Sequence, residues 1–156
     1  MRKRTLIGLV VAAMLALPTA VSAHGGSPET FTDVFKDVTE SFADVNPCAG
    51  NAPGTVTLTY NGVIHVTQFP DGHHHVTGTF TGTFVFDTTD PALPDYSGRF
   101  TQWFGENLNP DGFNATFTFR VKGAGTDGSS LRFNAVAHIT IVGSDVIVEF
   151  EKLRCG

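Results

Sequence analysis

The sequence predicts an all-β protein, an antiparallel up-and-down barrel of about seven or eight strands, with a β-sandwich as the alternative. Three observations support this class. Apolar and polar residues alternate with a period of two in most segments after residue 55. Asn, Asp, Gly and Pro separate these segments. No segment offers a helix to connect parallel strands. Fourteen Phe against one Trp and two Tyr indicate a Phe-rich interior.

The first 23 residues have the pattern of a signal peptide. Three basic residues at positions 2–4 precede a short apolar run, Leu6 to Leu17, and Val21–Ala23 supplies a small-residue cleavage site. We therefore predict a secreted chain that starts at His24 and keeps no membrane span. Cleavage would take the net charge from −5 to −8. An acidic chain without a basic stripe argues against nucleic acid as a partner.

The segment after the leader allows two interpretations. Apolar residues between Thr30 and Val45 have helical spacing, but the abundance of Thr, Val and Phe favours a strand. We expect a flexible segment over residues 24–37 and a strand over residues 38–45. The whole of residues 38–156 would then form one β-barrel domain.

Two dipeptides predict a double hairpin in the centre of the chain. Asn61-Gly62 and Asp71-Gly72 favour two-residue turns, because type I′ turns need positive φ at both central residues. They would divide residues 55–86 into three strands. Alternation from these turns predicts an inward face that includes Tyr60, His65, His74, Gly78, Phe80, Gly82 and Phe84.

Four further strands follow, over residues 96–105, 113–122 and 131–142 and from residue 146 onwards. Loops rich in Pro, Asp and Gly join them. Alternation turns one apolar face of each strand inward. The inward residues of the first two strands include Phe100, Gln102, Phe104, Phe117 and Phe119.

The two cysteines, Cys48 and Cys155, predict a disulfide, because an even pair in a secreted chain is most simply oxidised. An eight-stranded meander would place them at opposite rims, beyond the Cα separation of about 7 Å that a disulfide allows. Either the connection over residues 49–54 carries Cys48 back, or the N-terminal segment is not a barrel strand.

Phe-lined interiors with a few polar groups are typical of sites for apolar small molecules. The candidate ligand-binding residues are His65, His74, Tyr60, Phe80, Phe84, Phe100, Phe104, Phe117, Phe119 and Gln102. One alternative is a cyclase or isomerase that uses inward His and Tyr as acid and base. Another is a structural cell-surface domain with a filled core. No motif predicts a cofactor, and the oligomeric state stays open.

Three histidines are weak metal candidates, and we predict no metal site from them. His24 would become the N-terminal residue after cleavage, where its amine and imidazole can bind copper. His73 and His75 point the same way on one strand. Spacing alone supplies too few convergent ligands.

The whole mature chain resembles small secreted β-domain proteins of actinomycete-like bacteria, for which no activity is established. The matching segments are ESFADVNPCAG, VTLTYNGVIHVT, HVTGTFTGTFVF, TQWFGEN, FTFRVKGAG and EKLRCG. The resemblance implies export and a compact β-domain. At the level of the fold, the pattern is similar to calycin-type and allene-oxide-cyclase-type barrels.

Overall fold

The computed structural model describes residues 26–110, 112–143 and 145–156, without the side chains of residues 148–150. The predicted signal peptide and His24 therefore lie outside the described residues. Seven strands pair in sequence order, each antiparallel to the next. They are β1 (Glu29–Asn46), β2 (Ala52–Gln68), β3 (His74–Thr88), β4 (Tyr96–Asn109), β5 (Gly112–Gly125), β6 (Ser130–Val142) and β7 (Asp145–Cys155). The predicted all-β, up-and-down class is confirmed.

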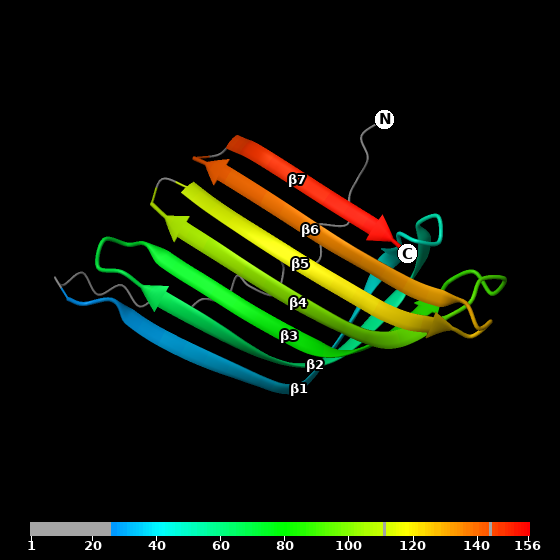
Figure 1. Cartoon of the computed structure of the whole chain (residues 1–156). Coiled ribbons are helices and arrows are strands. Elements are labelled where there is room, and N and C mark those ends of the chain that lie inside the picture. Colours follow the sequence, from blue (N-terminus) through cyan, green and yellow to red (C-terminus); the bar gives the residue numbers. More distant parts are fainter. Residues whose placement is uncertain (1–25, 111, 144) are drawn as a thin grey trace.

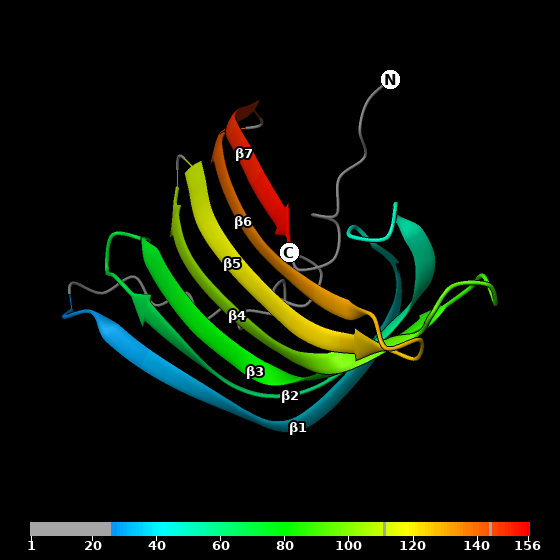
Figure 2. The same cartoon turned by 45° about the vertical axis from the view of Figure 1, so that its right-hand side comes forward.

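The seven strands form one strongly curved sheet, which curls into a trough (Figures 1 and 2). Strands β1 and β7 are its edges, because each pairs with a single neighbour among the described strands. The curvature agrees with a barrel, but no ladder between β1 and β7 closes the described part of the sheet. The concave face holds the apolar core.

Strand β1 settles the ambiguity of the N-terminal segment in favour of a strand. It begins at Glu29, within the segment expected to be flexible, and pairs with β2 along its whole length. The pairing shifts between Phe35 and Val38, where a β-bulge places Asp37 at a φ of 50°. A bulge of this kind bends a strand and frees a backbone group from the ladder.

The predicted hairpin at Asn61-Gly62 is wrong, since β2 runs through both residues without a turn. The reason lies in the neighbouring strands. The Asn61 side chain accepts a hydrogen bond of 2.9 Å from the backbone N–H of Asp37, at the bulge of β1. The Phe80 ring on β3 occupies the space that a side chain at residue 62 would need. Both residues therefore serve a continuous strand.

The predicted turn at Asp71-Gly72 is present, but its loop is longer by one residue. The backbone N–H of Phe69 donates to the carbonyl of His73 at 2.9 Å, which leaves Pro70, Asp71 and Gly72 in the loop. Gly72 has a φ of 86°, a conformation that glycine adopts without steric cost. A two-residue turn at Asp71-Gly72 would place Phe69 opposite His74, whereas the longer loop places Gln68 opposite His74.

The disulfide between Cys48 and Cys155 is confirmed, with Cα atoms 5.6 Å apart. The two cysteines were expected at opposite rims only if the chain formed eight strands. Because the two strands predicted around Asn61-Gly62 are one strand, β2, the sheet has seven strands, an odd number. Strands β1 and β7 then run in the same direction and end at the same rim. In Figure 1 the β1–β2 turn reaches the C-terminal end of β7 there. The bond thus joins the two edges of the sheet at one end of the trough.

Inward glycines opposite aromatic rings shape the concave face. Gly62 pairs with Phe80, Gly78 with Phe104, Gly82 with Phe100 and Gly98 with Phe84. A Cβ atom at Gly78 would meet the Phe104 ring, and one at Gly82 would meet the backbone of Thr59 and Tyr60. Rings therefore fill the space over Gly62 and Gly78, whereas the backbone of neighbouring strands closes over Gly82 and Gly98. Strands bend sharply where side chains are missing.

Candidate ligand cavity

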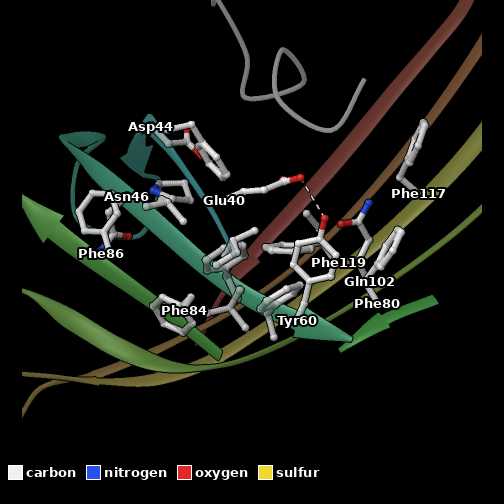
Figure 3. A pocket seen from close by; sticks show the side chains of 18 of the residues that line it. Glu40, Asp44, Asn46, Tyr60, Phe80, Phe84, Phe86, Gln102, Phe117 and Phe119 are labelled. Carbon is white, nitrogen blue, oxygen red and sulfur yellow. Dashed lines mark hydrogen bonds between the residues drawn. The ribbon is translucent and has the colours of Figure 1, made fainter. Parts of the chain in front are cut away.

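A cavity of about 340 Å³ opens on the concave face of the sheet. All seven strands contribute to its wall, which is mostly aromatic and aliphatic (Figure 3). Small-molecule sites commonly have volumes of about 300–1,000 Å³ and apolar walls with a few polar groups. The cavity lies at the lower end of that range, so its size suits one small molecule.

A chain of aromatic contacts crosses the floor of the cavity. Successive ring centroids are 5.1–6.4 Å apart, within the range of stabilising aromatic pairs. The rings follow one another from β1 to β6 in the order Phe35, Phe80, Tyr60, Phe100, Phe119 and Phe133. Because these side chains hold one another in place, they form a preformed apolar surface.

One hydrogen bond joins two polar side chains of the cavity wall. The Tyr60 hydroxyl donates to Oε1 of Glu40 at 3.0 Å, from β2 to the edge strand β1 (Figure 3). Burial of the phenol, together with this bond and the negative charge of Glu40, raises the pKa of Tyr60 to about 12. The phenol is therefore protonated at neutral pH and acts as a fixed donor.

Asn46, the last residue of β1, is the most buried polar residue of the wall, with 3% of its surface exposed. Its Oδ1 accepts a hydrogen bond of 3.0 Å from the backbone N–H of Cys48. Its Nδ2 has no partner among the described residues. An unpaired buried amide donor costs about 1–3 kcal/mol. Protein atoms cover this nitrogen, so a ligand in the cavity pairs with it only when the side chains over Asn46 move.

The remaining polar groups of the wall are Gln102 on β4 and the carboxylates of Glu40, Asp44 and Glu151. Gln102 is buried, whereas Glu40 is exposed and the other two carboxylates are half-buried. Glu40 and Asp44 come from β1 and Glu151 from β7, so acidic side chains flank both edges of the trough. No Lys, Arg or His lines the cavity within the described residues.

Asp44 provides a test of this electrostatic environment. Burial raises the pKa of its carboxyl above the ordinary value of 3.8, and the bond from the backbone N–H of Val45 only partly offsets that effect. Ionisation of Asp44 therefore lowers the free energy of unfolding as the pH rises from 3.8 through the folded-state pKa. We expect Asp44→Asn to stabilise the protein at pH 7 but not at pH 3, in urea unfolding at both values. The exposed Asp87→Asn is the control and should show no such difference.

Seven of the ten predicted ligand-binding residues line the cavity. They are Tyr60, Phe80, Phe84, Phe100, Gln102, Phe117 and Phe119. Phe104 is fully buried and packs behind the wall against Phe80 and Phe117. His74 begins β3 at the rim remote from the disulfide and is not among the lining residues.

His65 is the clear error among the predicted site residues. Because β2 continues through Asn61-Gly62, the alternation never restarts, and His65 points away from the cavity whereas Ile64 lines it. On the outer face, Nδ1 of His65 lies 2.9 Å from Oγ1 of Thr32. It therefore does not meet Tyr60 or His74 in a common site.

The weak metal candidates do not converge either. Nδ1 of His73 lies 2.7 Å from Oδ2 of Asp71, in the loop after β2. Nδ1 of His75 lies 2.7 Å from Oδ1 of Asn107 on β4. The described residues contain no group of three or more His, Cys, Asp or Glu side chains able to hold a metal ion. His24 is not among the described residues.

Sequence reasoning missed the contribution of β1 to the site. Glu40, Asp44 and Asn46 lie in the segment whose secondary structure was ambiguous. In a strand, the period of two places Val38, Glu40, Phe42 and Asp44 on one face. This alternation could have predicted the β1 wall, but only after the segment had been assigned as a strand and not as a helix. Alternation over residues 131–142 also predicts that Ala135 and Ala137 point inward, but only the structure shows that they border open space.

Comparisons with known proteins give no match to a family model, a curated protein or a solved structure. None of the residues that the structure describes forms a helix able to cross a membrane.

Proposed function

We propose that this chain is a secreted β-domain that binds an apolar small molecule on the concave face of its sheet. The observation that carries the proposal is an aromatic cavity of about 340 Å³ with an unpartnered donor, Nδ2 of Asn46, buried in its wall. The Cys48–Cys155 disulfide agrees with an extracellular location, because such bonds persist in oxidising compartments.

The wall also suggests which ligands are preferred. The apolar body would lie against the ring series, and an acceptor atom that displaces the side chains over Asn46 would pair with its Nδ2. Glu40, Asp44 and Glu151 would disfavour an anionic group in the cavity, because like charges repel in a partly desolvated site. The proposal is therefore for neutral or cationic apolar molecules.

The two other functions have less support. The cyclase or isomerase alternative requires His65, His74 and Tyr60 to converge, and these side chains lie on different faces or ends of the sheet. The purely structural alternative requires a filled interior, whereas the concave face leaves open space beside Ala135 and Ala137.

A cavity-filling substitution tests the proposal. The neutral fluorophore N-phenyl-1-naphthylamine should bind the protein and brighten, because it enters an apolar environment. In Ala137→Phe, a ring fills the cavity and affinity should fall by at least about tenfold, the equivalent of 1.4 kcal/mol. Fluorescence titration gives the affinities, and urea unfolding verifies that the variant is folded.

Ala124→Phe is the matched control, because it makes the same change at an exposed position of β5. It should bind the probe as the wild type does. The anionic analogue 1-anilinonaphthalene-8-sulfonate should bind more weakly than the neutral probe. The proposal fails if neither probe binds, or if both alanine variants bind the neutral probe equally well.

A further inference from the structure

The convex face of the sheet gathers most of the positive charge of the chain. Seven Lys and Arg side chains belong to the described residues, and only Lys36 lies outside β4–β7. The other six are exposed and alternate with residues that line the cavity or are buried, so they all point outward. We call this surface the basic face; it consists of Arg99, Arg120, Lys122, Arg132, Lys152 and Arg154.

Three of these cations form a row across neighbouring strands, a basic stripe that was not apparent from the sequence. Arg99 on β4 pairs with Lys122 on β5, which in turn pairs with Arg132 on β6. Directly opposite residues have Cβ atoms about 4.5–5.5 Å apart, and like charges in such positions are destabilising. The fold therefore tolerates an electrostatic cost at this row.

No carboxylate of the protein relieves this cost within the described residues. None of the six cations forms an ion pair there. Asp95 and Asp127, in the loops beyond this end of the sheet, accept hydrogen bonds from the backbone N–H groups of Thr88 and Ser129. The outward positions of β4–β6 carry no acidic residue. The positive charges are left for an external anion.

Neutral hydroxyl groups border the row. Thr101 lies two residues from Arg99 on the same face of β4 and pairs with Arg120. Threonine hydroxyls donate and accept hydrogen bonds, as sugar hydroxyls do. Trp103 lies two residues further along β4, and its ring extends over Gly105, away from the row.

We propose that the basic face binds a linear anionic polysaccharide, with its carboxylates along the row Arg99–Lys122–Arg132 and its hydroxyls beside Thr101. A linear polymer can follow a row across a convex surface, whereas a flat bilayer touches such a surface only along a line. The net charge of −5 opposes polymers of dense charge, such as nucleic acids, more than a polymer with one carboxylate per sugar. The site lies on the opposite face from the cavity and does not depend on the function proposed for it.

Polygalacturonate, with one carboxylate per sugar, is the probe, and isothermal titration at an ionic strength of about 0.05 M measures its binding. We expect the double variant Arg99→Gln/Arg132→Gln to bind at least about tenfold more weakly, because it removes both ends of the row. Binding should also weaken when the ionic strength rises to about 0.5 M.

The control Thr30→Glu/Thr32→Glu changes the net charge by the same amount at exposed positions of β1, three strands from β4. Through β2 and β3 these positions are in register with Asn107 and Gly105, far along β4 from Arg99. The control should keep the affinity within about twofold of the wild type, since the added charges lie farther from the row than the Debye length of about 14 Å. The proposal is overturned if polygalacturonate does not bind or if both double variants lose affinity equally. Tighter binding of oligothymidylate or of phosphatidylglycerol vesicles would also overturn it. Urea unfolding of each variant excludes loss of the fold as the cause.

Discussion

Replacing Cys48 and Cys155 with serine should lower the free energy of unfolding by about 4–5 kcal/mol, the loop-closure value for a long cross-linked segment. The two residues are 107 positions apart, so the bond closes most of the described chain into one loop. Domains of this size are commonly stable by only about 5–15 kcal/mol. Loss of the disulfide would therefore remove a large part of the total free energy of unfolding.

The effect on the cavity should accompany the loss of stability. The disulfide ties the β1–β2 turn to the end of β7, and Asn46 and Pro47 of the cavity wall lie next to Cys48. Urea unfolding and N-phenyl-1-naphthylamine titration of the double-serine variant measure both effects. The wild type treated with dithiothreitol should match the variant. An unchanged urea midpoint would show that the sheet edges hold together without the bond.

Phe104→Ala should be the most damaging substitution of a single apolar side chain, at a cost of about 3–5 kcal/mol. Phe104 has no exposed surface. Its ring stacks between Phe80 and Phe117, at 5.9 and 6.3 Å, and covers the bare backbone of Gly78. No neighbouring side chain projects from residue 78 to fill the space, so the truncation leaves a void.

Trp103→Ala is the control for Phe104→Ala, because it removes an even larger ring from the adjacent position of β4. Because 44% of the Trp103 surface is exposed, Trp103→Ala should lower the free energy of unfolding much less, by no more than about 1 kcal/mol. Chemical unfolding of both variants gives the comparison. Equal losses would contradict the view that burial against Gly78, and not ring removal as such, sets the cost.

Local alternation was enough to predict most of the cavity wall. On β4 and β5, Phe100, Gln102, Phe117 and Phe119 occupy the inward positions expected from the period of two. These strands contain no internal turn signal, so the pattern along each strand fixes its faces.

The central segment shows where local reasoning fails. Asn-Gly has a strong preference for type I′ turns, yet Asn61 accepts a hydrogen bond from the bulge of β1 and the Phe80 ring covers Gly62. Neither contact is visible in the dipeptide itself. The missing turn reversed the expected face of His65 and changed the number of strands, and with it the rim to which Cys48 belongs.

The sequence by itself determined the antiparallel all-β class, the disulfide partners and the inward faces of β3, β4 and β5, because these depend on period, composition and cysteine number. Only the tertiary structure decided the continuity of β2, the open edges of the sheet and the grouping of charge on its two faces. The reason is that strand pairing brings together residues far apart in the chain. It aligns Arg99 with Lys122 and Arg132, and it unites the carboxylates of β1 and β7 around one cavity.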